Sequence, residues 1–270
     1  MEWPHNKVEK PTPKVVLHFL RHSIKETAPE KSDLDIKLSE SGRDLAAEKY
    51  ENPLNMRFAH VAGSTRIRTH ETAAVAATQN TEAGVEDLGV GKLRIKEELD
   101  FNVDETGEYG KRFNKEYAEG ALMTFLVHTS DTFAKENGDT NSSTYSRMAA
   151  NIARTVYRNF EVASRGASIL EQSEHPENEI NDFERILVTH ATIQESFLLK
   201  VVEKIQGIAA RDNLLTLIGE NGFGYTEGFD VTLSKENGDE QIRIVYKKGD
   251  YVFDEVIPLV VIKEIIDEGE

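Results

Sequence analysis

Two short apolar runs that each lead to a histidine constrain this chain most. Val15–Leu20 is followed by Arg21 and His22, and the run Arg185–Thr189 is followed by His190. Both runs are short and lack polar alternation, which is typical of strands that are buried on both faces of a parallel sheet. Ligands bind at the carboxyl ends of such strands, so the sequence predicts a functional site where these two runs end.

Helical patterns alternate with the predicted strands. The strands are predicted at residues 15–20, 57–62, 93–97 and 185–190, and helices at 38–47, 66–77 and 192–206, with Ser39 as the N-cap of the first helix. This order predicts an α/β fold, a three-layer α/β/α sandwich with a mostly parallel central sheet.

The remaining segments differ from this pattern. Residues 1–13 carry three prolines and are predicted to form a flexible lead, while 14–270 is predicted to be a single domain. Within it, 105–180 is expected to be a helical insertion or lid with helices at about 111–136 and 143–171, and 207–270 a C-terminal extension. Phe229–Leu233 and Ile242–Tyr246 alternate around Asn237-Gly238, which predicts a β-hairpin, and 251–266 is expected to add a strand and a terminal helix.

The charge and the missing cysteines exclude several classes of function. A net charge of −16 disfavours general binding to nucleic acid or an anionic membrane. The chain has no cysteine, which excludes disulfides, thiol catalysis and thiolate metal sites. With no leader-like or bilayer-length apolar segment, the chain is predicted to be a cytoplasmic protein.

Four cationic or imidazole groups are predicted to meet at one edge of the sheet. His22, Arg21 and His190 follow strand ends, and Arg68 lies near the start of the helix that follows the second strand. Together with helix N-termini they would favour an anion. A single histidine at a strand end is more often a packing residue, so the prediction depends on the convergence of all four.

Four sequence blocks, in order, resemble the histidine phosphatase superfamily, the phosphoglycerate-mutase-like proteins. Leu20-Arg21-His22-Ser23 resembles the Arg-His-Gly signature of that family, and Asp35–Gly42 its D-x-x-L-[ST]-x-x-G block. Ser64–Ala73 is similar to S-P-x-x-R-A-x-Q-T-A, and Val188–Ala191 to V-x-H-G. The blocks cover roughly residues 15–75 and 184–198, whereas 105–180 and 207–270 resemble nothing specific.

The resemblance implies a phosphohistidine mechanism. His22 would be the nucleophile, and Arg21, Arg68 and His190 would bind the phosphoryl oxygens. No metal and no cofactor would be required. Where one branch of the family has an acidic residue after its second histidine, this chain has Ala191, which sets it apart from the acid-phosphatase branch.

The general acid is expected to come from the acidic segment after the third strand. The carboxylates there are Glu97, Glu98, Asp100, Asp104 and Glu105. By resemblance to the mutase-like branch, Glu98 is the first choice and Asp100 the second.

Departures from the family pattern leave the substrate open. Ser23 replaces the usual glycine, and further replacements are Thr65, Thr69, Glu71 and Ala191. None removes a phosphate-binding charge, so the prediction is a phosphatase acting on a small phosphorylated metabolite or a phosphorylated protein side chain. A phosphoglycerate-type mutase and a non-catalytic module that binds a phosphorylated ligand are the alternatives, and the oligomeric state is left open.

Overall fold

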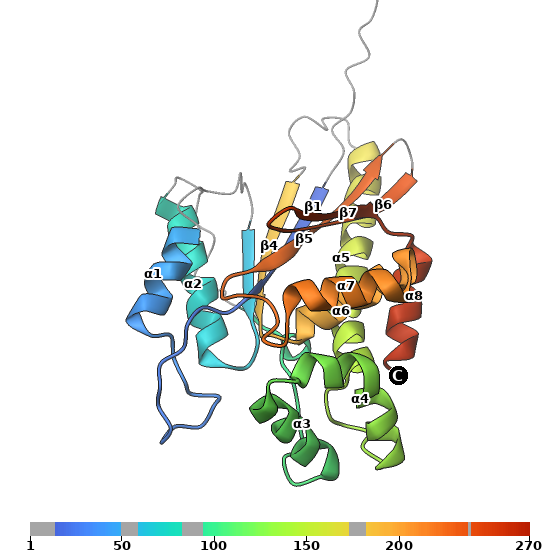
Figure 1. Cartoon of the computed structure of the whole chain (residues 1–270). Helices are drawn as coiled ribbons and strands as arrows, with labels where there is room; N and C mark the ends of the chain where they lie inside the picture. The colour runs from blue at the N-terminus through green and yellow to red at the C-terminus, as the bar shows by residue number, and fades with distance from the viewer. Residues whose placement is uncertain (1–13, 50–58, 83–93, 173–181, 237–238) are drawn as a thin grey trace, which may run out of the picture.

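A mixed sheet forms the centre of the protein. The computed structural model describes residues 14–49, 59–82, 94–172, 182–236 and 239–270, and the seven strands found there form one sheet in the order β3-β2-β4-β1-β5-β6-β7 (Figure 1). The parallel part consists of β1 (Lys14–Arg21), β2 (Ala59–Gly63), β3 (Arg94–Ile95) and β4 (Asp182–Thr189). The antiparallel part consists of β5 (Gly228–Glu236), β6 (Asp239–Lys248) and β7 (Tyr251–Val256).

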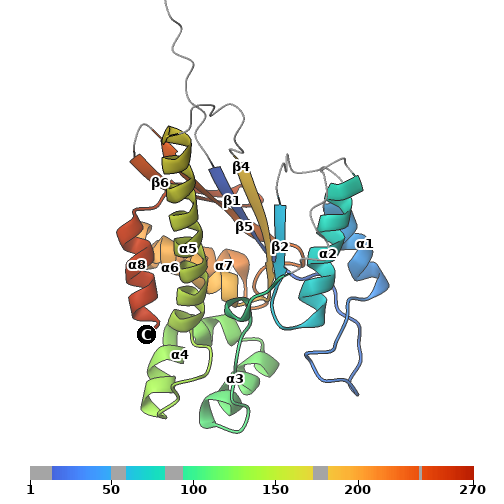
Figure 2. The same cartoon turned by 180° about the vertical axis from the view of Figure 1, so that it is seen from behind.

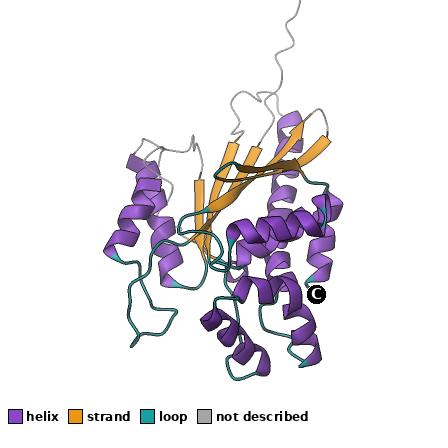
Figure 3. Ribbon diagram, in the orientation of Figure 1, coloured by secondary structure: helices purple, strands orange, loops and turns teal. Residues whose placement is uncertain are grey.

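Helices cover both faces of this sheet, so the predicted three-layer α/β fold is confirmed. Figures 1 and 2 show α1 (Glu40–Lys49) and α2 (Ile67–Glu82) at one side of the sheet. The other side is covered by α5 (Tyr145–Gln172), α6 (Ile193–Gln206), α7 (Ile208–Ile218) and α8 (Leu259–Glu268). Beyond the carboxyl ends of β1 and β4 lie α3 (Glu108–Glu119) and α4 (Leu122–Glu136), as the ribbon in Figure 3 also shows.

Local sequence explains where these elements begin and how they pack. On β1, Val15, Leu17 and Phe19 are at most 1% exposed and belong to the main core, as the continuous apolar run predicts. The predicted N-cap is present, because the Ser39 hydroxyl accepts a hydrogen bond from the Gly42 amide at 3.0 Å.

Three predictions about the elements need correction. The helix expected at 111–136 is divided into α3 and α4 because Gly120 adopts a left-handed conformation with φ of 70°. The strand expected at 93–97 is reduced to Arg94–Ile95, followed by a short 3-10 helix at Glu97–Leu99. Helix α7 is absent from the predictions.

Residues 105–180, expected to form an insertion, lie partly in the core and partly beyond the end of the sheet. The expected insertion 105–180 contains α5, whose buried residues are part of the main core beside β1 and β5. Of the α-helices in the described residues, only α3 and α4 lie outside the layers (Figure 3). The expected C-terminal hairpin is present as β5 and β6, while its turn Asn237-Gly238 and the lead 1–13 fall outside the described residues. In the described part of the chain, no helix combines the length and the apolar character needed to cross a bilayer.

A buried histidine in the sheet provides a pH-dependent contribution to stability. His18 on β1 is 8% exposed, with Nδ1 2.7 Å from Asp230 Oδ1 and Nε2 3.7 Å from Glu184 Oε2. Burial alone would lower its pKa, but the two carboxylates prevail and raise the pKa of His18 to about 9. The protonated ring is therefore favoured by folding.

Because folding raises the pKa of His18, the stability of the protein should depend on pH. The stabilisation is complete below the unfolded pKa of about 6.5 and is lost as pH rises through about 9. Over that window we expect the unfolding free energy of the wild type to fall by on the order of 2 kcal/mol relative to that of His18→Gln. The effect is smaller than the full pKa shift would give, because half-exposed Asp230 weakens the ion pair. Urea titrations at several pH values measure it. His128→Gln, at a histidine whose side chain is 40% exposed, should show the same change of unfolding free energy with pH as the wild type. If His18→Gln showed that same change, His18 would not be the source of the pH dependence.

Candidate active site

The ends of β1 and β4 bring two histidines together. These strands pair in parallel with Arg21 opposite Thr189, and the His22 amide donates to the Thr189 carbonyl at 2.9 Å. His22 and His190, the next residues, therefore lie side by side, with ring centroids 5.2 Å apart and the planes at 62°. Both are buried, at 6% and 3% exposure. The neighbouring Thr192 has φ of 79°, a conformation that costs energy in a non-glycine residue and is found most often at functional sites.

The hydrogen bonds of His22 fix its tautomer. Its Nδ1 lies 2.6 Å from the carbonyl of Ser23, and since a carbonyl only accepts, Nδ1 carries the proton. The lone pair is then on Nε2, which accepts a hydrogen bond from Arg68 Nε at 3.2 Å. Burial, followed by the charge of Arg68, lowers the pKa of His22 to about 3. The ring is thus neutral near pH 7, as a nucleophile must be.

Arg68 is held between His22 and an aspartate. Its Nη2 donates to the carboxylate of Asp33 at 3.0 Å, and its Nη1 donates to the Asp33 carbonyl at 2.7 Å. Arg68 is only 3% exposed. Burial lowers the pKa of Arg68 from its usual value, and the neighbouring Asp33 offsets part of that effect. The Asp33 carboxylate therefore occupies the guanidinium edge that suits a tetrahedral oxyanion.

Arg21 is positioned by the segment that precedes β5. Its Nη1 donates to the carbonyls of Asn221 and Phe223, and its guanidinium lies over the Tyr225 ring, 4.7 Å from the centroid. The same ring lies 6.2 Å from the ring of His22. Arg21 and Tyr225 thus form one side of the space around His22.

His190 contacts the site through its Nε2. This atom is 2.7 Å from the Ser64 hydroxyl and 3.6 Å from Asp100 Oδ1. Burial, followed by the charges of His22 and Arg68 nearby, lowers the pKa of His190 well below its usual value. The ring is therefore neutral in this structure.

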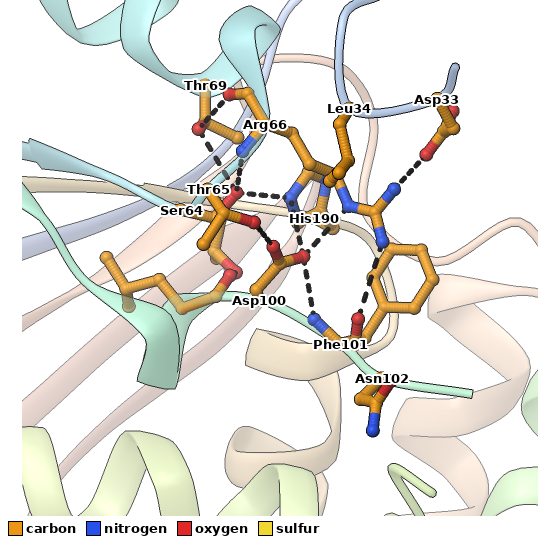
Figure 4. Close-up of polar contacts among 12 residues, drawn as sticks. Asp33, Leu34, Ser64, Thr65, Arg66, Thr69, Asp100, Phe101, Asn102 and His190 are labelled. Atoms are coloured by element: carbon orange, nitrogen blue, oxygen red, sulfur yellow. Dashed lines mark hydrogen bonds and ion pairs between the residues drawn. The ribbon is translucent and has the colours of Figure 1, made fainter. Parts of the chain in front are cut away.

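Arg66 links the segments around the site (Figure 4), and sequence reasoning missed it. Its Nε donates to Asp100 at 2.8 Å, its Nη1 contacts Asp33, and its guanidinium stacks 4.1 Å from the centroid of Phe101. The Phe101 ring meets the ring of His190 edge-on at 5.4 Å. The family pattern leaves position 66 unspecified, so the only available signal was its spacing of two residues from Arg68.

The two candidate acids are placed differently. Asp100 lies inside the site, where Thr65, Arg66 and the Phe101 amide donate to its oxygens (Figure 4). The polar contacts of Glu98 are instead with Lys96 at 3.4 Å and Arg158 at 3.0 Å. Burial would raise the pKa of Glu98, but its own amide and these two cations lower it. The structure therefore brings Asp100 close to His190, whereas Glu98 is paired with Lys96 and Arg158.

Three buried polar atoms around His22 have no hydrogen-bond partner among the described residues. They are Arg21 Nε, Ser23 Oγ and His190 Nδ1. A buried polar atom without a partner is costly and calls for an explanation such as a catalytic role or a bound ion. Two of these atoms belong to the predicted phosphate-binding residues, and Ser23 is a departure from the family pattern.

Comparison with known proteins identifies the fold. No protein-family profile matches the sequence, and no curated protein is significantly similar to it. Among solved structures, phosphoglycerate mutase from Bacillus anthracis is 12% identical, with a TM-score of 0.50 over 95% of this chain and 99% of that one. A mycobacterial glucosyl-3-phosphoglycerate phosphatase bound to inorganic phosphate is 18% identical, with a TM-score of 0.48 over 87% and 97%. The likeness to the mutase shows a shared fold.

Proposed function

We propose that this chain, which has the phosphoglycerate-mutase-like fold of the histidine phosphatase superfamily, hydrolyses phosphate monoesters through a phosphohistidine on His22. The observation that carries the proposal is the state of His22. Its proton is held on Nδ1 by the Ser23 carbonyl and its Nε2 lone pair points to Arg68 in a buried site. A neutral ring with its proton fixed on Nδ1 and its lone pair on Nε2 is what attack on a phosphorus atom requires.

The first step transfers the phosphoryl group to the enzyme. The lone pair of His22 Nε2 forms the bond to phosphorus while the bond to the ester oxygen breaks, and that oxygen leaves with a proton from a general acid. Because Arg68 Nε donates to the same lone pair in this structure, that hydrogen bond must break before attack. In the second step water gives a proton to the carboxylate left by the general acid and attacks phosphorus. The P–N bond breaks, its electron pair returns to His22 Nε2, and phosphate is released.

Fixed positive charge would stabilise the transferring group. Arg21 supplies guanidinium donors in a site shielded from water, where such donors are most effective. Arg68 can supply its own donors once Asp33 and His22, which accept from it in this structure, release them. A phosphate dianion beside His190 would favour its protonated form, in which Nδ1 donates to a phosphoryl oxygen. These groups can perform the chemistry without a metal, so we include metal independence in the proposal.

The substrate class follows from charge. The acidic chain would repel a large polyanion away from the site. This repulsion favours a small phosphorylated metabolite or a phosphorylated protein side chain over nucleic acid. The solved mutase that shares the fold is described as acting on phosphoglycerate, which is a small phosphorylated molecule of this kind. A cytoplasmic location stays a prediction.

The test is hydrolysis of p-nitrophenyl phosphate with EDTA present, and in parallel isomerisation of 3-phosphoglycerate. We expect phosphate release that EDTA does not reduce, and no isomerisation. Activity that EDTA abolishes would contradict the metal-free mechanism. Isomerisation without hydrolysis would make the protein a mutase. If neither reaction occurs while inorganic phosphate binds in calorimetry, the protein is a binding module.

A further inference from the structure

A fully buried carboxyl group lies outside the proposed chemistry. Glu195, in the first turn of α6, is 0% exposed. Its Oε1 accepts a hydrogen bond from the Phe223 amide at 2.5 Å, while its buried Oε2 has no hydrogen-bond partner among the described residues. A buried carboxyl without full pairing is expensive, so this position needs an explanation other than helix formation.

Glu195 fixes the segment between α7 and β5 at its centre. Gly222 packs against it so closely that a Cβ there would lie 2.6 Å from Glu195 Oε1 and 3.3 Å from the Cβ of Ala191. Gly222 also has φ of 70°, which glycine adopts without strain. The segment therefore passes directly over the residue that follows His190, and Phe223 is anchored on its far side by stacking on Tyr246 at 4.9 Å.

The same segment holds Arg21. The carbonyls of Asn221 and Phe223 accept from its guanidinium, and the Tyr225 ring lies against it. The backbone is tied as well, because Thr226 donates to the Arg21 carbonyl at 3.1 Å and the Arg21 amide donates to Glu227 at 2.9 Å. Through Phe223, the carboxyl of Glu195 is thus connected to a guanidinium that borders the nucleophile.

We propose that Glu195 is a positioning residue that holds residues 221–225 against Arg21 and thereby sets the affinity of the site for a tetrahedral oxyanion. The inference rests on the proposed function only in taking this site as the phosphate site. Glu195 itself touches neither His22 nor a substrate. It acts through the Phe223 amide, which its carboxyl orients.

The surroundings of Glu195 make this control depend on pH. The charged and titratable groups that face it are Arg21 from β1, Glu227 from the segment before β5 and Tyr246 from β6, with Lys248 paired to Glu227 at 3.3 Å. Burial raises the pKa of Glu195 to about 7, although the Phe223 amide and Arg21 lower it. An anion bound beside Arg21 disfavours the ionised carboxyl, so by linkage anion affinity should fall as pH rises through about 7.

The experiment measures binding of tungstate by equilibrium dialysis from pH 6 to 8.5, at micromolar concentrations where it remains a monomeric tetrahedral dianion. Glu195→Gln retains an oxygen that can accept from Phe223, so we expect wild-type affinity at pH 6 and a smaller decline toward pH 8.5, the remaining decline coming from His190. Glu195→Leu removes the acceptor, and we expect about tenfold weaker binding at every pH, equivalent to about 1.4 kcal/mol.

A second pair of variants keeps the test valid if Glu195→Leu does not fold. Gly222→Ala pushes against Glu195 from the other side and should weaken tungstate binding to a similar extent. Gly120→Ala is the matched control, because Gly120 also has φ of 70° but a Cβ added there would meet nothing within 4 Å. It should carry the strain of the substitution and leave tungstate affinity unchanged.

The outcomes separate this inference from the proposed function. Equal tungstate affinity in wild type, Glu195→Leu and Gly222→Ala, or an unchanged pH dependence in Glu195→Gln, overturns the role of Glu195 while hydrolysis can persist. Tungstate binding that responds as expected in a protein without hydrolytic activity supports Glu195 and overturns the phosphatase. A wild type that binds no tungstate overturns both.

Discussion

Replacing His22 with alanine should reduce hydrolysis of p-nitrophenyl phosphate by at least about 10³-fold, because removal of a nucleophile leaves only the catalysis that binding and electrostatics provide. The variant keeps Arg21, Arg68 and His190, so it should still bind inorganic phosphate. The measurement is steady-state turnover with EDTA present.

A second readout identifies the covalent intermediate. Wild-type protein mixed with a labelled phosphate ester and quenched in alkali should retain label that acid then removes, which is the behaviour of a phosphohistidine. His22→Ala should retain none. His128→Gln, at a partly exposed histidine on α4, is the control and should match the wild type in turnover and label. Turnover that persists in His22→Ala would exclude His22 as the nucleophile.

The general acid should be revealed by changing the leaving group. p-Nitrophenolate is a weak base and departs without a proton, whereas the alkoxide of glycerol phosphate needs one. If Glu98 is the acid, Glu98→Gln should lower kcat/KM for glycerol phosphate by roughly 10²–10³-fold and change that for p-nitrophenyl phosphate by less than about tenfold. This role requires Glu98 to leave Lys96 and Arg158 when substrate binds, because those cations hold it in this structure.

Asp100 should behave differently from Glu98. Its oxygens accept from Thr65, Arg66 and the Phe101 amide, and it lies 3.6 Å from His190. Asp100→Asn should therefore lower kcat/KM for both substrates alike, because it weakens contacts that hold the site together and does not remove the proton donor. Selective loss with glycerol phosphate in Asp100→Asn, and not in Glu98→Gln, would transfer the role to Asp100. Glu97→Gln, in the same turn, is the control and should be close to wild type.

The sequence predicted the centre of the site better than its surroundings. His22 and His190 could be placed together because parallel strands end at one edge of a sheet, and a short apolar run before each histidine marks such a strand. In the structure Arg21 lies opposite Thr189 in the sheet, so the histidines that follow them are neighbours. The convergence of Arg21 and Arg68 depended on the same topology.

The groups that surround His22 could not be predicted, because loops and long-range packing bring them there. Asp33 is one of many acids in a polar segment, and only the path of residues 24–38 brings it to Arg66 and Arg68. Glu195 in the first turn of a helix is an ordinary sequence feature, since acids are favourable there. Its burial results from residues 219–227, whose path no local pattern encodes. Gly120, which can end a helix, is a signal in the sequence that the prediction of one helix at 111–136 did not use.

The order of strands in the sheet has a consequence for how the chain reaches its native state. β1 is hydrogen-bonded on both sides to strands from the distal part of the chain, with Lys14 opposite Asp182 on β4 and Ser234 on β5. The strand that leads to His22 thus finds no partner strand among the segments synthesised soon after it. We expect slow folding dominated by non-local contacts, and an exposed apolar strand on nascent chains until β5 has emerged. Helices α1 and α2 therefore have no complete surface to dock on until most of the polypeptide is present.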